Sequence, residues 1–228
     1  MELNLDLVKW FVNEREKIRL GGPTEDYVLN NSRFCNINRE DDKVSKWIFK
    51  NCLRINQVAF ARLVNRIDLL KTVASLQWSL PAYLELPGAK TNSGAYQFYP
   101  RKGETINTII NEIIGADLET IIPEITKGKS IKEASLAMSK YFGRPLHFYW
   151  MQVILDLGHM GLIDIDMNSE VYQGPGGEKV IKTIGMSINE LSEELNYPPH
   201  IIEHICCEVR KYYDRSTKGI PNNRKRSA

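Results

Sequence analysis

The sequence lacks any long apolar run and any strong excess of charge of one sign. Its longest apolar stretches, such as residues 109–115, are far shorter than the roughly 20 residues that span a bilayer. We therefore expect no membrane partner. The 30 basic residues nearly balance the 28 acidic ones and leave a net charge of +2. This balance excludes a uniformly basic nucleic-acid-binding protein, so any basic surface must be local.

Cysteine is scarce, and its spacing excludes several roles. No Cys-x-x-Cys pair occurs among the four cysteines, which are Cys35, Cys52, Cys206 and Cys207. The N-terminus has a charged residue at position 2 and no pattern of a secretory leader. We expect reduced thiols and a location in the cytoplasm.

Phosphate loops, repeats and alternating strand patterns are also missing. No Gly-x-x-x-x-Gly-Lys-Ser/Thr segment occurs, which argues against ATP-dependent phosphorylation by this chain. Helical spacing dominates instead: Leu3, Leu7, Val8 and Phe11 share one face of a segment that stops at residues 21–23. The sequence predicts an all-α fold.

Further helices follow the same spacing. Apolar residues over 44–48 and 58–70 predict a helical pair with Asn56 as a cap, and the Pro- and Gly-rich residues 81–103 predict a long loop. Capping boxes at Ser130-Ile-Lys-Glu133 and Ser187-Ile-Asn-Glu190 each mark a helix start.

The last helix is expected to begin at Pro198-Pro199 and to run through about residue 213. Seven basic residues against one acid lie between positions 209 and 228, which provides the local basic surface. We predict one helical domain over residues 1–215, followed by a basic, flexible tail over 216–228.

The densest polar cluster spans residues 33–42, just ahead of a predicted helix. Its acidic residues suit the positive end of the helix dipole, which is a structural explanation. A chemical explanation is also available, because Arg33 and Arg39 can grip phosphate while Asp41 or Asp42 holds a metal or accepts a proton. Spacing alone does not decide between the two.

Two other segments have alternative interpretations. His200-Ile-Ile-Glu203-His204 has the form of an inverted zincin signature, but the only later glutamate, Glu208, lies on nearly the same helical face, which disfavours a zinc peptidase. Residues 174–179, Gly-Pro-Gly-Gly-Glu-Lys, form either an ordinary turn or the hairpin of a helix-hairpin-helix motif that holds a DNA phosphate.

Several ordered motifs together resemble one family. Arg33-Phe34-Cys35-Asn36, Arg39-Glu40-Asp41-Asp42 and Trp47 resemble the opening motif of the helical domain attached to phage 5-hydroxymethyluracil DNA kinases. The same motif opens the free-standing alpha-glutamyl/putrescinyl-thymine pyrophosphorylases, also described as amino acid:DNA transferases. The similarity continues through residues 61–67, 93–96 and 174–176 and ends with Glu203-His204-x-x-Cys207-Glu208-x-x-Lys211-Tyr212.

The resemblance implies a helix-hairpin-helix, DNA-glycosylase-like fold that flips bases and acts on double-stranded DNA carrying modified thymine. In the family's pathway a kinase converts 5-hydroxymethyluracil to a pyrophosphate ester, and the transferase replaces pyrophosphate with an amino acid or polyamine. A chain without a phosphate loop resembles the transferase, located in the cytoplasm of a bacteriophage's bacterial host.

The resemblance also implies roles for individual residues. In the predicted catalytic group, His204 or Glu208 is the base and Glu203 orients a partner or recognises the amine. Asp41 or Asp42 holds a magnesium ion. The predicted substrate and pyrophosphate ligands are Arg33, Asn36, Arg39, Arg66, Tyr96 and Lys211. The predicted DNA contacts are Gly174, Gly176, Lys179, Arg210 and Arg215. Magnesium held by Asp41 or Asp42 is the metal site that this interpretation allows, and metal dependence stays open.

Three alternatives remain open. A glycosylase or lyase would use the same flipping architecture and release a free base. A non-catalytic DNA-binding subunit would present modified DNA to a separate kinase or transferase. The isolated helical module of a kinase is disfavoured by the missing phosphate loop.

Overall fold

The chain is helical throughout the part that the structure describes. A computed structural model describes residues 1–32, 34–35, 37–38, 41–91, 98 and 100–219. Within those residues there are thirteen α-helices and no strand, which confirms the predicted all-α class. No described helix combines the length and apolar character that crossing a bilayer requires.

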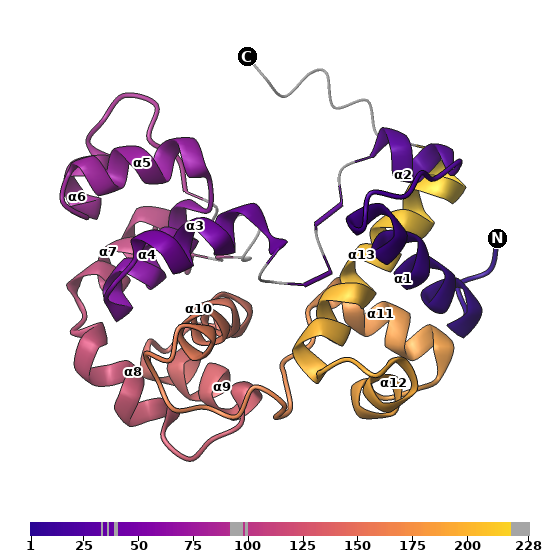
Figure 1. The fold of residues 1–228 in the computed structure, drawn as a ribbon. Helices are drawn as coiled ribbons and strands as arrows, with labels where there is room; N and C mark the ends of the chain where they lie inside the picture. Colours follow the sequence, from indigo (N-terminus) through magenta and orange to yellow (C-terminus); the bar gives the residue numbers. More distant parts are fainter. Residues whose placement is uncertain (33, 36, 39–40, 92–97, 99, 220–228) are drawn as a thin grey trace. The chain divides into compact units, whose positions relative to one another are not determined.

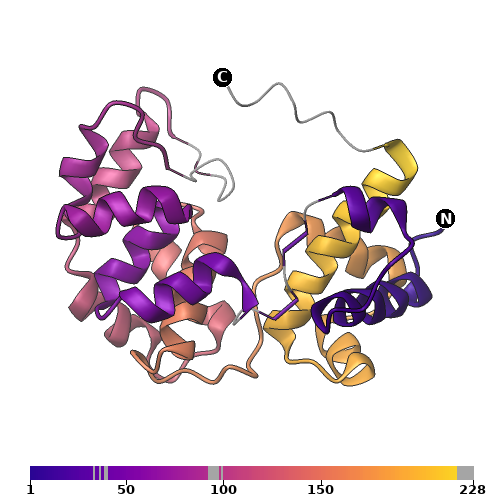
Figure 2. The ribbon, with the colours of Figure 1, turned by 45° about the horizontal axis from the view of Figure 1, so that its top comes forward.

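The chain divides into two compact units. Unit 1 joins the two ends of the sequence, residues 1–42 and 173–228, and the indigo and yellow helices lie side by side in Figures 1 and 2. Its helices are α1 (Leu5–Arg19), α2 (Tyr27–Asn31), α11 (Pro175–Ile184), α12 (Ile188–Leu195) and α13 (Pro199–Lys218).

Helix α13 is the centre of unit 1. It packs against α11, α12, α1 and α2, and its apolar side chains at three- and four-residue spacing are buried against them. Ile202, Ile205 and Val209 are fully buried. The same helix carries the polar residues of the candidate site, so the core of unit 1 fixes their positions.

Unit 2 comprises residues 43–172. Its helices are α3 (Lys43–Asn51), α4 (Ile55–Val64), α5 (Ile67–Ser75), α6 (Leu80–Leu84), α7 (Ile106–Gly115), α8 (Leu118–Thr126), α9 (Ile131–Tyr141) and α10 (His147–His159). Helix α10 packs against α9, α4 and α3. The fully buried Tyr149 donates a hydrogen bond to the carbonyl of Ala59 at 2.9 Å, which ties α10 to α4.

Both predicted capping boxes are confirmed. The Ser130 hydroxyl accepts from the Glu133 amide at 3.2 Å, and the Ser187 hydroxyl accepts from the Glu190 amide at 3.2 Å. In return, each glutamate accepts from the backbone of its serine, and these bonds lower the pKa values of both carboxyls. The first backbone amides of a helix have no partner within the helix, and these side-chain oxygens accept hydrogen bonds from them.

The expected helix over residues 58–70 is interrupted. Asn65 adopts the left-handed conformation with φ 51° and ends α4, and α5 begins two residues later. Asn tolerates this conformation better than most residues, so it serves as a helix stop. The helix also begins at residue 55, with Arg54 and not Asn56 at the cap position.

The glycine-rich segment at residues 174–177 is a helix start. Gly174 is the N-cap of α11 and Pro175 occupies its first turn. Proline is tolerated there because a backbone N–H at this position would have no hydrogen-bond partner within the helix. The preceding helix ends at His159, and residues 160–174 contain no helix or strand. The helix-hairpin-helix interpretation of this segment stays a prediction.

The sequence predicts one domain over residues 1–215, and this stays a prediction. The structure describes two compact units within that range. The boundaries fall after residues 42 and 172, and the glycine-rich segment at residues 174–177 lies directly after the second boundary. The basic tail over residues 216–228 also stays a prediction, and its first three residues belong to α13, which continues through Lys218. The residues from 220 onward lie outside the described part of the chain.

Candidate functional site

Helix α13 brings most of the predicted catalytic residues together within unit 1. Three of them lie on two consecutive turns of this helix: Glu203, His204 and Glu208. The four-residue spacing of His204 and Glu208 places these two side chains next to each other on the helix surface. Glu203 and Glu208 are almost fully buried, with exposed fractions of 3% and 2%. Buried carboxylates require hydrogen-bond partners, and these partners explain how the site is built.

Glu208 is held by groups distant in the sequence. One carboxylate oxygen accepts from the Cys35 amide at 3.0 Å, and the other pairs with the ammonium of Lys211 on the next turn. The guanidinium of Arg15 donates to the Cys35 carbonyl at 3.3 Å and adds positive charge near Glu208. The backbone of residue 35 is therefore held by α13 at its amide and by α1 at its carbonyl.

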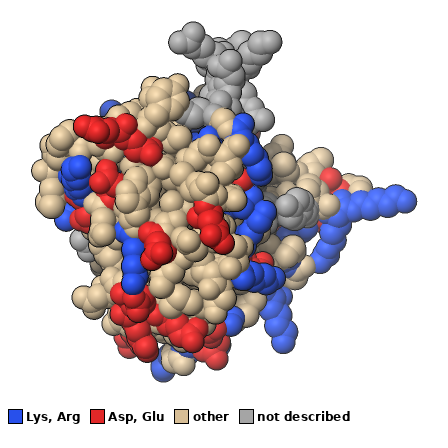
Figure 3. Space-filling model, turned by 90° about the vertical axis from the view of Figure 1, so that its right-hand side faces the viewer, with Lys and Arg blue, Asp and Glu red and all other residues tan. Residues whose placement is uncertain are grey.

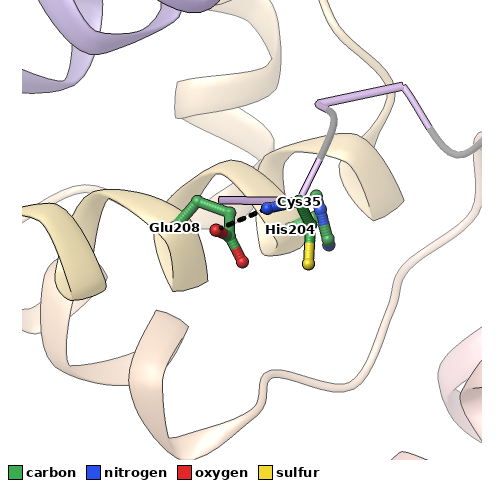
Figure 4. A group of neighbouring side chains, drawn as sticks. All are labelled: Cys35, His204 and Glu208. Carbon is green, nitrogen blue, oxygen red and sulfur yellow. Dashed lines mark hydrogen bonds between the residues drawn. The ribbon is translucent and has the colours of Figure 1, made fainter. Parts of the chain in front are cut away.

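This fastening creates a group of three different side chains. The Cys35 sulfur, a ring nitrogen of His204 and a carboxylate oxygen of Glu208 all lie within 4.8 Å of one another. In Figure 4, His204 and Glu208 project from the same helix and Cys35 joins them from the segment beside it. A thiol, an imidazole and a carboxylate in contact can exchange protons or share a metal ion.

The Cys35 thiol stays protonated near neutral pH. Although residue 35 as a whole is exposed, surrounding protein removes water from the thiol, and this desolvation together with the Glu208 charge raises its pKa to about 11. Desolvation disfavours the charged form, and a nearby carboxylate repels a second negative charge. Cys35 is therefore not poised as a thiolate nucleophile.

Glu203 holds the start of α11 and does not face solvent. Its carboxylate accepts from the Gly174 amide at 3.2 Å and from the Cys207 thiol at 3.4 Å. A negative charge at a helix N-terminus is favourable, so Glu203 stabilises this start. The approach is close: a Cβ added at Gly176 would lie 3.4 Å from the Cys207 sulfur. The amide of Gly174, predicted to contact DNA, is thus bound within the protein.

Phe34, which precedes Cys35 in the sequence, packs among aromatic and basic side chains of unit 1. Its ring centre lies 5.7 Å from that of Phe11 and 6.3 Å from that of Tyr212. The guanidiniums of Arg15 and Arg215 lie over the same ring at 5.9 and 5.1 Å, within cation–π range. Arg215, a predicted DNA contact, is thereby placed beside Phe34.

The other predicted DNA contacts are partly neutralised. Arg210 pairs with Asp214 at 2.8 Å, and Lys218 contacts the same carboxylate at 2.9 Å. Lys179 on α11 is near enough to Asp214 to help lower the pKa of that carboxyl. On the face shown in Figure 3, acidic side chains gather along the lower edge, whereas basic side chains line the right-hand part. Asp214 therefore neutralises part of the positive charge of these side chains within the protein.

The structure does not bring every predicted residue to this group. Asp41 and Asp42 lie in unit 1 just before α3, with Asp41 Oδ2 3.9 Å from Arg19 Nη1, but neither joins a metal-type group among the described residues. Arg66 lies in unit 2 as the cap of α5, with Nη2 2.6 Å from Asp68 Oδ2. Arg33, Asn36, Arg39 and Tyr96 lie outside the described residues.

Sequence reasoning missed the parts played by Cys35 and Arg15. The zincin-like pattern points to a further metal ligand that follows His204 in the sequence. Cys35 instead precedes Glu208 by 173 residues. The only available signal was the position of Cys35 inside the Arg-Phe-Cys-Asn motif. No spacing rule would have indicated a contact between these distant segments.

Comparison of the chain with family models, curated proteins and solved structures finds no match. The resemblance to amino acid:DNA transferases therefore rests on the sequence motifs themselves.

Proposed function

We propose that this protein is a transferase that replaces the pyrophosphate of 5-pyrophosphoryloxymethyl-deoxyuridine in DNA with an amino acid or polyamine. The observation that carries the proposal is the meeting of His204 and Glu208 with Lys211 and Arg15 in unit 1. This arrangement places proton acceptors next to fixed positive charges, which are the two components that such a reaction needs.

The reaction needs a base because the incoming amine arrives as an ammonium ion. His204 and Glu208 lie one turn apart and share one side of α13, so either can accept the proton directly or through the other. A positioned base contributes roughly 100- to 10,000-fold to such a step. Glu203 acts indirectly, because it fixes α11 against α13.

The departing pyrophosphate needs positive charge. Lys211 and Arg15 already counter the buried carboxylate of Glu208, and Arg215 lies beside Phe34 close to the same segment. Preorganised cations stabilise the charge that develops on a leaving group without reorganising at the moment of reaction. Arg33, Asn36 and Arg39, neighbours of Cys35 in the sequence, belong to the same proposed pyrophosphate-binding set.

The proposal includes a wider context. The substrate is double-stranded DNA carrying modified thymine, a 5-hydroxymethyluracil DNA kinase supplies the ester, and the setting is the cytoplasm of a phage-infected bacterium. A helix-hairpin-helix, glycosylase-like arrangement with base flipping belongs to this proposal, in which Tyr96 contacts the base and Arg66 contacts phosphate. Magnesium at Asp41 and Asp42 belongs to it as well.

The direct test uses DNA that contains 5-pyrophosphoryloxymethyl-deoxyuridine. The purified chain is incubated with this DNA and a pool of amino acids and polyamines, and the digested nucleosides are analysed by mass spectrometry. An amine-adducted thymidine together with released pyrophosphate would establish transfer and identify the amine.

Two other results would contradict the proposal. Free modified base would indicate a glycosylase. Unchanged nucleosides, despite salt-sensitive DNA binding, would indicate a subunit that binds DNA without catalysis.

A further inference from the structure

The group formed by Cys35, His204 and Glu208 contains one sulfur, one nitrogen and one oxygen donor. We infer that Cys35, His204 and Glu208 form a binding site for a zinc-type divalent cation, with the fourth coordination position open. This inference goes beyond the transferase proposal and does not depend on it, because binding is measured with metal and protein alone.

The donor set selects the type of ion. Zinc accepts thiolate, imidazole and carboxylate ligands in tetrahedral sites, whereas magnesium and calcium require oxygen ligands. No fourth donor of these types joins the group among the described residues. Three protein ligands with one open position are typical of zinc sites that bind water or substrate.

The geometry requires only a small closing movement. Zinc bonds of roughly 2.0–2.3 Å place tetrahedral ligand atoms roughly 3.3–3.8 Å apart. The three donor atoms already lie within 4.8 Å of one another. Rotation of the Cys35 and His204 side chains about their χ angles covers the difference while α13 stays in place.

The scaffold holds the ligands in advance. His204 and Glu208 are separated by one helical turn, the spacing at which two side chains of one helix can reach the same ion. The Cys35 backbone is held by Glu208 at its amide and by Arg15 at its carbonyl. The thiol is therefore kept beside α13 and is not carried on an untethered loop.

Positive charge beside Glu208 opposes cation binding: Lys211 pairs with its carboxylate and Arg15 adds charge nearby, and the Lys211 pair provides a sharp test. The Lys211 ammonium pairs with Glu208, so an arriving cation must compete with it. Removing this competitor in Lys211→Met should tighten zinc binding by about tenfold, the size of effect that groups surrounding the ligands commonly have. A Lys211→Met variant that binds zinc more weakly would contradict this site.

The decisive experiment titrates the full chain, after chelator treatment, with Zn²⁺ against a chromophoric competitor, and with Co²⁺ as a spectroscopic probe. We expect one equivalent of zinc and a thiolate-to-cobalt absorption band. Cys35→Ser should abolish that band and weaken zinc binding at least about 100-fold, and His204→Gln should weaken it similarly.

Cys207→Ser is the matched control, because Cys207 is a second thiol near a buried carboxylate of the same helix. It should leave zinc affinity and the cobalt band unchanged, and circular dichroism verifies that each variant remains helical. The inference is overturned if wild-type protein binds no zinc, if Cys35→Ser binds it equally well, or if Cys207→Ser has the effect expected of Cys35→Ser.

Discussion

Buried charges are handled differently in the two units. In unit 2, Arg62 pairs with Asp156 on α10 and Arg144 pairs with both Glu104 and Glu112, so charged side chains neutralise one another. In unit 1, the buried carboxylates of Glu203 and Glu208 accept from the backbone amides of Gly174 and Cys35. Charges in unit 2 cross-link helices and the connections between them, whereas those in unit 1 hold a loop and a helix start beside a thiol and an imidazole.

Removing Asp156 should have the largest effect on stability. Asp156 is fully buried and Arg62 has an exposed side-chain fraction of 6%, so Asp156→Ala leaves a buried guanidinium without its countercharge. We expect a loss of about 3–5 kcal/mol in the free energy of unfolding, measured by urea denaturation.

Asp68→Ala is the matched control for that variant. The Arg66–Asp68 pair has side-chain exposures of 55% and 62%, and exposed pairs contribute less than about 1 kcal/mol. Equal losses for Asp156→Ala and Asp68→Ala would contradict the structural role assigned to the buried pair in unit 2.

Glu208→Gln should have a smaller effect on stability, because an amide retains the shape and one acceptor oxygen. The variant loses the charge-assisted hydrogen bond to Cys35 and the ion pair with Lys211. We expect a loss of about 1.5–3 kcal/mol in the free energy of unfolding. Glu194→Gln on the exposed face of α12 is the control, and if it proves equally destabilising, Glu208 does not fasten residue 35.

Acid should weaken the Arg144 cross-link of unit 2. Hydrogen bonds from Arg144 lower the pKa of Glu104 from its ordinary value of 4.5 to about 2, and Arg144 also lowers the pKa of Glu112. A carboxyl whose folded-state pKa is lowered contributes stability above its unfolded pKa, and this is lost as the pH falls. Urea titrations between about pH 5 and 2 should show the loss, and Arg144→Gln should reduce this pH dependence. An unchanged dependence would contradict the assignment.

The sequence predicts local structure well where the determinants are local. The capping boxes at Ser130 and Ser187 were confirmed because a segment of four residues contains the whole signal. The stop at Asn65 was not foreseen, because apolar spacing runs across it without a break and only its left-handed conformation interrupts the helix. The Gly-Pro-Gly segment could not be assigned from the sequence alone, because proline and glycine are found in both turns and helix starts, and the structure places it at the start of α11.

The site was predictable only in part. The helical spacing of Glu203, His204 and Glu208 follows from the sequence, but the contacts that determine their surroundings do not. Glu208 meets Cys35 across 173 residues and Glu203 meets Gly174 across 29, and such contacts depend on how the chain ends pack in unit 1. Glu203 had been expected to orient the amine or a partner, yet its described hydrogen bonds are to Gly174 and Cys207.

The most direct test of the account compares one histidine from each unit in the transfer reaction. His204→Gln alters unit 1 beside Cys35 and Glu208, whereas His147→Gln alters a half-buried imidazole of unit 2 that packs against Tyr172. With pyrophosphoryl-modified DNA and the accepted amine, His204→Gln should lower the rate of adduct formation by about 100-fold or more, while His147→Gln should leave it near that of the wild type. Equal rates for the two variants would contradict the central claim that the chemistry belongs to α13 of unit 1.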